Sequence, residues 1–191
     1  MKNLTIALLG QPNSGKSTLF NGLTGAKQHV GNWPGKTVEK KEGYFVRNGV
    51  RYTLVDLPGS YGLSANSDEE VITREYITSG KADVVALIAD ASQLNRSLFM
   101  LADFAGINVP VVLLMNMMDI AAKQGKTVDI KGFEKELGVP VVPIVAADKA
   151  QYKDLFAFLD GFDGKSALKT ASLEKSYESV LGKLYKDLTA L

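Results

Sequence analysis

The sequence has no cysteine and only one histidine, His29, among its 191 residues. Without cysteine the chain can form no disulfide and no zinc–thiolate site, and it has no thiol nucleophile. A single histidine cannot build a histidine metal cluster, and His29 is interpreted as a solvated loop residue. Thiol enzymes and zinc–thiolate proteins are therefore excluded.

An excess of either charge and a long hydrophobic run are also missing. Lys and Arg number 22, Asp and Glu 21, and the net charge is +1. This balance argues against a generally basic surface, so no nucleic-acid partner is expected. No apolar stretch approaches the ~20 residues of a membrane helix, and Leu4–Leu9 is too short for a signal-peptide core. We expect a cytosolic chain, which can still be one piece of a longer protein.

Strand patterns alternate with helical patterns along the chain, which is typical of an α/β domain with a parallel sheet. Runs rich in Val, Leu and Ile predict strands covered on both faces: Leu4–Leu9, Val84–Asp90, Val111–Asn116 and Val141–Val145. The predicted helices are Lys16–Leu23, Asp68–Thr78, Asn95–Ala105, Ile130–Leu137 and Tyr152–Leu159.

A hairpin and a terminal segment complete the prediction. Asn48-Gly49, between strand patterns at Val38–Arg47 and Val50–Asp56, is a strong hairpin signal. We therefore expect a mostly parallel six-stranded sheet with one antiparallel edge strand and helices on both faces.

The predicted domain covers 1–164. In the remaining segment, 165–191, an apolar stripe predicts a helix over Ser172–Ala190, which either packs on this domain or begins a truncated or vestigial helical domain.

Gly10 to Ser17 matches the phosphate-binding pattern G-x-x-x-x-G-K-S, between a strand and a helix. The glycines let backbone N–H groups point at phosphate oxygens, and the helix N-terminus adds positive partial charge. Lys16 is expected to reach the outer phosphates and Ser17 to bind Mg²⁺. The residues expected around the phosphates are Gly10, Pro12, Asn13, Ser14, Gly15, Lys16, Ser17 and Thr18.

Two later segments add ligands for Mg²⁺ and the γ-phosphate. Asp56-Leu57-Pro58-Gly59 ends a strand, so Asp56 can hold Mg²⁺ through water and the Gly59 amide can approach the γ-phosphate. Thr37 follows Gly35 in a glycine-rich loop, where its hydroxyl can complete the Mg²⁺ coordination.

Two further segments indicate which nucleotide base the site binds. Asp119, in Asn116-Met117-Met118-Asp119, can accept from the N1 and N2 donors of guanine, a pair that adenine lacks. After the last core strand, Val145, Ala146 and Ala147 offer backbone amides. In this order and at these strand ends, the motifs resemble those of Ras-like GTPases. Such GTPases usually carry serine where Ala146 stands, so this chain lacks a side-chain hydrogen bond there, which predicts rapid nucleotide exchange.

The stretches VGNWPGKTVEKKEGYF, from Val30 to Phe45, and DLPGSYGL, from Asp56 to Leu63, resemble the N-terminal cytosolic GTPase domain of the FeoB family of bacterial ferrous iron transport proteins. This resemblance covers Leu4 to about Leu159. It implies slow GTP hydrolysis that regulates or drives ferrous iron uptake. It also implies a location at the cytoplasmic face of the inner membrane and, as partner, the membrane permease domain of the full-length protein; self-association is left open. Lys36 departs from the family's usual valine.

Several residues can supply the positive charge that stabilises the transition state. Ser60, directly after Gly59, is too short to orient water as glutamine does in many small GTPases, and no arginine precedes Thr37. The FeoB resemblance implies that Asn13 helps to bind K⁺, together with the carbonyls of Gly31 and Trp33. Two alternatives stay open: Asn13 stabilises its turn, or the Lys36 ammonium supplies the charge. The expected catalytic residues are Asn13, Lys16, Thr37 and Gly59.

Two other functions fit the same motifs. GTPases of ribosome assembly or tRNA modification share the Pro-Asn-x-Gly-Lys-Ser loop, but they would normally bring an RNA-binding or partner domain. A non-catalytic module could bind guanine nucleotide and signal by loop ordering. Trp33, the only tryptophan, then has either a packing role or a switch role.

Overall fold

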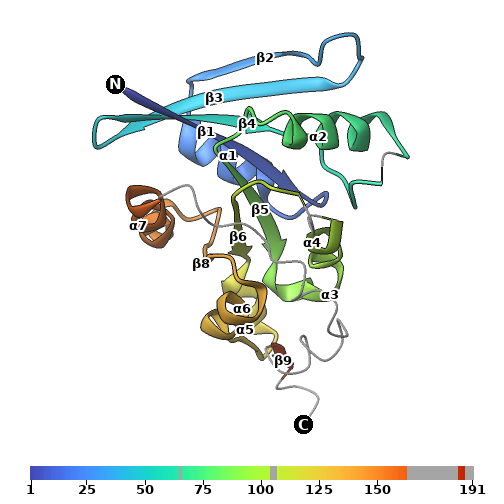
Figure 1. Ribbon diagram of the computed structural model, residues 1–191. Coiled ribbons are helices and arrows are strands. Elements are labelled where there is room, and N and C mark those ends of the chain that lie inside the picture. The colour runs from blue at the N-terminus through green and yellow to red at the C-terminus, as the bar shows by residue number, and fades with distance from the viewer. Residues whose placement is uncertain (65, 104–106, 163–184, 188–191) are drawn as a thin grey trace.

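The computed structural model describes residues 1–64, 66–103, 107–162 and 185–187, and a seven-stranded sheet forms its centre (Figure 1). The strand order is β2-β3-β4-β1-β5-β6-β8. The strands of this sheet are β1 Lys2–Gly10, β2 Gln28–Asn32, β3 Glu39–Arg47, β4 Val50–Asp56, β5 Val84–Asp90, β6 Val111–Asn116 and β8 Val141–Pro143.

The predicted fold class is confirmed. The strands β4, β1, β5, β6 and β8 pair in parallel, whereas β3 pairs antiparallel with β4. The β3–β4 hairpin turns at Asn48 and Gly49, whose φ angles of 48° and 75° are those that a two-residue hairpin loop requires.

The predicted strand number was wrong by one, because β2 adds a seventh strand at the edge, antiparallel to β3. All five residues of β2 are exposed. A strand without a buried face lacks the alternation of apolar and polar residues by which strands are recognised. His29, interpreted as a solvated loop residue, is exposed but lies in this strand.

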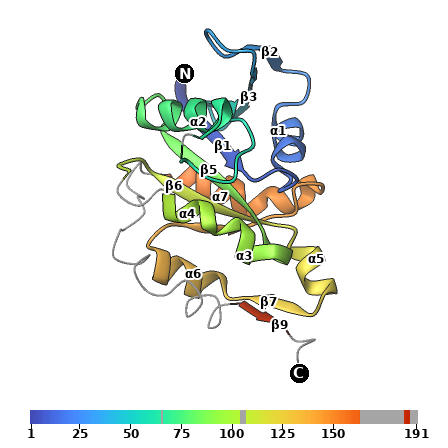
Figure 2. The same ribbon diagram turned by 90° about the vertical axis from the view of Figure 1, so that its right-hand side faces the viewer.

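Helices cover both faces of the sheet (Figure 2). On one face, α1 Lys16–Thr24 and α7 Lys153–Gly161 share a core with Ile6, Leu8 and the other inward residues of that side. On the opposite face, residues of α2, α4 and α6 share a second core with Ala7, Leu9 and the other inward residues of that side. The helices of that side are α2 Asp68–Thr78, α3 Leu94–Ser97, α4 Phe99–Asp103, α5 Met118–Lys123 and α6 Ile130–Leu137.

Local signals account for several helix ends. The Ser67 hydroxyl accepts a hydrogen bond from the Glu70 N–H and caps α2, and Asp129 caps α6 through the Gly132 N–H. Gly138, with φ of 71°, ends α6 in the left-handed region. The predicted helix Asn95–Ala105 is instead split into α3 and α4, and residues 104–106 lie outside the described part.

The predicted C-terminal helix was wrong where the structure describes it. Residues 185–187 form β9, Tyr185–Asp187, which pairs antiparallel with β7, Lys126–Val128. Tyr185 packs against the core and donates to the Ser92 carbonyl at 3.2 Å, so tertiary contacts override the local helical stripe. The rest of Ser172–Ala190 and the predicted boundary at 164 lie outside the described residues.

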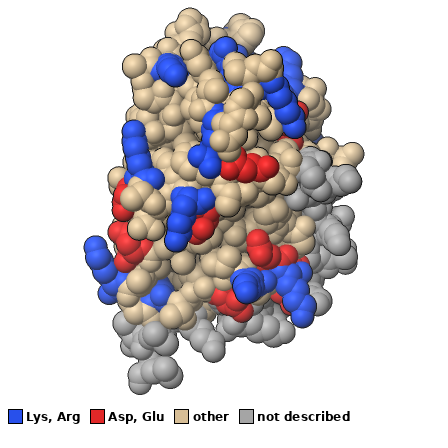
Figure 3. Space-filling view, turned by 90° about the vertical axis from the view of Figure 1, so that its left-hand side faces the viewer, with Lys and Arg blue, Asp and Glu red and all other residues tan. Residues whose placement is uncertain are grey.

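Two surface features complete the description. Lysine and arginine are intermixed with aspartate and glutamate on the face shown in Figure 3. None of the helices in the described ranges combines the length and apolar character that a membrane span requires.

Candidate nucleotide-binding site

The phosphate-binding loop connects β1 to α1, as expected. Asn13 and Gly15 have φ angles of 67° and 93°, so the loop passes twice through the left-handed region. A Cβ at Gly15 would lie 2.1 Å from the Asn116 side-chain nitrogen, so only glycine fits there. Asparagine tolerates positive φ better than most residues, which supports a turn-forming role for Asn13. Its side chain is also exposed, so a ligand role stays open.

Lys16 connects this loop to the end of β4. Its ammonium donates to the Asp56 carboxylate and, at 2.7 Å, to the Leu57 carbonyl. Both charged side chains are almost buried, with exposed fractions of 11% and 9%. A Cβ added at Gly59 would lie 3.7 Å from Pro12. Residues 40 or more positions apart are therefore assembled at one edge of the sheet, where the parallel strands end.

Asn116 joins the phosphate end of the site to the loop after β8. Its side-chain nitrogen donates to the Ser14 carbonyl at 2.8 Å, and its side-chain oxygen accepts from the Ala146 N–H at 2.8 Å. Met117, with φ of 60°, turns the chain into α5, and Asp119 in the first turn of that helix is exposed. Asn116 is therefore used to hold the two loops together, while the Asp119 carboxylate remains accessible to a base.

The segment from Gly31 to Thr37 lies against α2. Trp33 is buried and meets the Tyr76 ring edge-on at a centroid distance of 5.5 Å, and burial raises the pKa of Tyr76 to about 12. Lys36 pairs with Asp68 at 2.6 Å. Thr37 is exposed.

Within the described ranges, no hydrogen bond or ion pair joins Gly31, Trp33, Gly35 or Thr37 to the phosphate-binding loop. The structure therefore brings together the phosphate-loop residues, Asp56, Gly59, Asn116 and Ala146, but not the four residues of this segment. Trp33 has a packing role in this arrangement.

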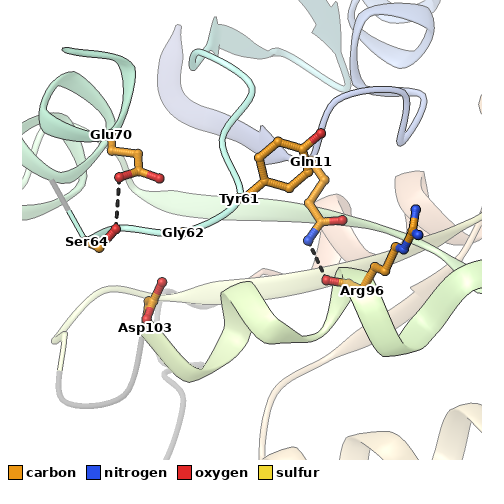
Figure 4. A pocket seen from close by; sticks show the side chains of 7 residues that line it. All are labelled: Gln11, Tyr61, Gly62, Ser64, Glu70, Arg96 and Asp103. Atoms are coloured by element: carbon orange, nitrogen blue, oxygen red, sulfur yellow. Dashed lines mark hydrogen bonds between the residues drawn. The ribbon is translucent and has the colours of Figure 1, made fainter. Parts of the chain in front are cut away.

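Sequence reasoning missed a cavity of about 540 Å³ beside the phosphate-binding loop (Figure 4). Gln11 extends from that loop toward α3, where its side chain donates to the Arg96 carbonyl. On the other side, the Asp103 carboxylate accepts from the Leu63 N–H at 2.8 Å. Gln11 lies in the phosphate-binding motif, and Tyr61 and Gly62 lie in the stretch DLPGSYGL. No motif predicts the cavity itself, because it arises from packing between helices and loops. Its lining residues are Gln11, Tyr61, Gly62, Ser64, Glu70, Arg96 and Asp103.

The fold and the assembled loops define a G domain, the class of α/β domain built around a phosphate-binding loop and a guanine-recognition motif. Residues 4–158 match the family described as ferrous iron transport protein B, and the chain belongs to this family. The family resemblance is thereby confirmed. The match places the chain in this family and separates it from the ribosome-assembly and tRNA-modification GTPases that share its phosphate-binding loop.

Relatives and solved structures agree with this assignment. The chain is 49% identical over 150 residues to the Fe(2+) transporter FeoB of Salmonella typhimurium, covering 76% of this chain and 19% of the relative. It therefore spans about a fifth of that protein's length. The structure of the G domain of T. maritima FeoB is similar, with 41% identity and a TM-score of 0.74, over 83% of this chain and 95% of that chain.

A second solved structure is the cytosolic domain of T. maritima FeoB in its GMPPNP form. It is similar with 40% identity and a TM-score of 0.79, over 87% of this chain and 66% of that chain. That relative was therefore crystallised with a GTP analogue.

Proposed function

We propose that this chain binds and hydrolyses GTP as the cytosolic domain of a longer ferrous iron transport protein, at the cytoplasmic face of the membrane. The observation that carries the proposal is the pair of hydrogen bonds made by Asn116, which hold the phosphate-binding loop and the Ala146 loop in one arrangement. The family match and the GMPPNP form of a relative support guanosine phosphates as ligands. Hydrolysis would regulate or drive iron uptake by the membrane permease domain.

The proposed phosphate contacts follow from the loop geometry. Backbone N–H groups of the loop and of the first turn of α1 would surround the phosphates, and Lys16 would exchange Asp56 for the outer phosphates. Ser17, Thr37 and Asp56 would hold Mg²⁺, whose charge stabilises the negative charge of the transferred phosphoryl group. Two hydroxyls and one carboxylate are oxygen donors that suit this ion.

The base contacts follow from exposure and charge. Asp119 would accept from guanine N1–H and N2–H, since it is exposed and lies three residues after Asn116. Asn116 in turn binds the loop of Val145, Ala146 and Ala147 through the Ala146 N–H. The loop would contact the base through its backbone, with the Ala147 amide as donor, since the Ala146 N–H already donates to Asn116.

We further propose that K⁺ stimulates hydrolysis and that Asn13 supplies one of its oxygen ligands. The Asn13 carboxamide is exposed, and the Trp33 carbonyl accepts one hydrogen bond, from the Lys36 N–H at 3.0 Å. A carbonyl oxygen has a second lone pair, so it can also bind a cation. Lys36 pairs with Asp68 on α2, which weakens its case as the alternative source of charge.

Steady-state phosphate release tests this function. The chain should turn over GTP many times, should act on ATP at a far lower rate, and should work faster in K⁺ than in Na⁺ at equal ionic strength. Binding of GTP without multiple turnover would favour the non-catalytic signalling module. Equal use of ATP would contradict guanine recognition.

A further inference from the structure

The backbone of Ala146 is held by two buried side chains, one on its N–H and one on its carbonyl. Its N–H donates to the Asn116 side-chain oxygen at 2.8 Å, and its carbonyl accepts from the Tyr152 hydroxyl at 2.6 Å. Ala146 and Tyr152 are 4% and 2% exposed, so water does not compete for these bonds. The loop that lacks a serine hydroxyl at position 146 thus gains its fixed orientation from two other residues.

Tyr152 is itself fixed in place. The Asp148 carboxylate accepts from the Ala150 N–H at 3.0 Å and begins the 3₁₀ turn Lys149–Tyr152. A Cβ at Gly22 of α1 would lie 2.3 Å from the Tyr152 hydroxyl oxygen, so the phenol occupies space that only glycine leaves free. Burial raises the pKa of Tyr152, so the hydroxyl remains a donor at neutral pH.

We propose that Tyr152 is a positioning residue for the guanine base. By fixing the Ala146 carbonyl, its hydroxyl orients the peptide plane that this carbonyl shares with the amide of Ala147, and Ala147 is exposed. This inference rests on the proposed guanine-nucleotide function. Tyr152 belongs to none of the nucleotide-recognition motifs. The inference makes the retention of GDP depend on the hydrogen bond between its hydroxyl and the Ala146 carbonyl.

A second buried tyrosine provides a matched control. Tyr52, also 2% exposed, belongs to the same core and donates to the Leu159 carbonyl at 3.3 Å. Leu159 lies in α7 and outside the loop of Val145, Ala146 and Ala147. Tyr52→Phe and Tyr152→Phe therefore remove the same group from the same core, and only the second removes it from the site.

The test is the dissociation rate of a fluorescent GDP analogue, chased with unlabelled GDP, in the unsubstituted chain and in both variants. Loss of one buried hydrogen bond predicts release roughly fivefold faster in Tyr152→Phe, with a similar rise in KM for GTP and a smaller change in kcat. Tyr52→Phe should lower the melting temperature comparably and release GDP at the original rate.

Two results would overturn the inference: an unchanged rate in Tyr152→Phe, or equal acceleration in Tyr52→Phe. Failure of the unsubstituted chain to bind GDP would instead overturn the proposed function, and this inference with it.

Discussion

Lys16 and Asp56 form an ion pair inside the site, and they come from segments 40 residues apart. One belongs to the phosphate-binding loop and the other to the end of β4. The proposed phosphate and Mg²⁺ contacts use the same two side chains, so nucleotide binding must separate the pair. Removal of either partner alone would leave the other charge unpaired in an almost dry position.

The first prediction concerns this ion pair. Lys16→Ala should destabilise the nucleotide-free chain by about 3 kcal/mol, because the Asp56 carboxylate then lacks its partner. Lys16→Ala combined with Asp56→Asn should recover part of that loss. Denaturant unfolding without nucleotide measures both. If Lys16→Ala unfolds at the original denaturant concentration, the pair is not a structural contact.

The second prediction concerns Trp33 as a reporter. Because Trp33 is the only tryptophan and packs against Tyr76, ordering of Thr37 by GTP and Mg²⁺ should change its fluorescence. The emission spectrum should differ between saturating GDP and a non-hydrolysable GTP analogue, and Thr37→Ala should abolish the difference. Thr37→Ala should also slow hydrolysis far more than it weakens GDP binding. Identical spectra at saturation would contradict a switch in this segment.

The third prediction concerns Ala146. Its Cβ is 3.8 Å from the position that a Cβ would take at Gly15, so a serine hydroxyl at 146 would lie beside the phosphate-binding loop. Ala146→Ser should slow GDP release severalfold, about one hydrogen bond or ~1 kcal/mol. Stopped-flow release of labelled GDP gives the rate. An unchanged or faster rate would mean that the missing hydroxyl does not cause rapid exchange.

The fourth prediction concerns Asn13. Asn13→Ala should abolish the stimulation of GTP hydrolysis by K⁺ relative to Na⁺ and leave GDP affinity nearly intact. Lys36→Ala, which breaks only the pair with Asp68, should retain the stimulation. Hydrolysis rates in both salts at equal ionic strength separate the alternatives. Loss of activity in Lys36→Ala but not in Asn13→Ala would assign the charge to the lysine and leave the asparagine a turn residue.

Much of the fold was predictable because its signals are local. The helices Asp68–Thr78 and Ile130–Leu137 and the strands Val84–Asp90 and Val111–Asn116 have the predicted bounds. The buried strands are continuously apolar, and the capping residues Ser67 and Asp129 mark where helices begin. Edge strand β2 and strand β9 were missed, because both depend on a partner strand distant in sequence and not on an apolar pattern.

The residues of the site likewise fall into those that the sequence predicts and those that it does not. The phosphate-binding loop, Asp56 and Asn116 are recognisable because each motif follows directly from a core strand. Tyr152 and Arg96 are not, since an ordinary helix-forming stretch surrounds each of them and only the packing of distant segments gives them neighbours in the site. The contact of Trp33 with α2 depends likewise on a tertiary arrangement.

The most direct test of the account is the nucleotide preference of Asp119→Asn. Charged, bidentate hydrogen bonds in a partly dry site are worth a few kcal/mol, so the substitution should weaken GDP binding roughly a hundredfold. Because the asparagine amide can donate to the oxygen of xanthine, the same variant should gain affinity for XDP, while ADP should bind weakly to both proteins. Isothermal titration with GDP, XDP and ADP measures all three. A reversed preference from GDP to XDP is the predicted result; an unchanged GDP affinity in Asp119→Asn would contradict guanine recognition at this site.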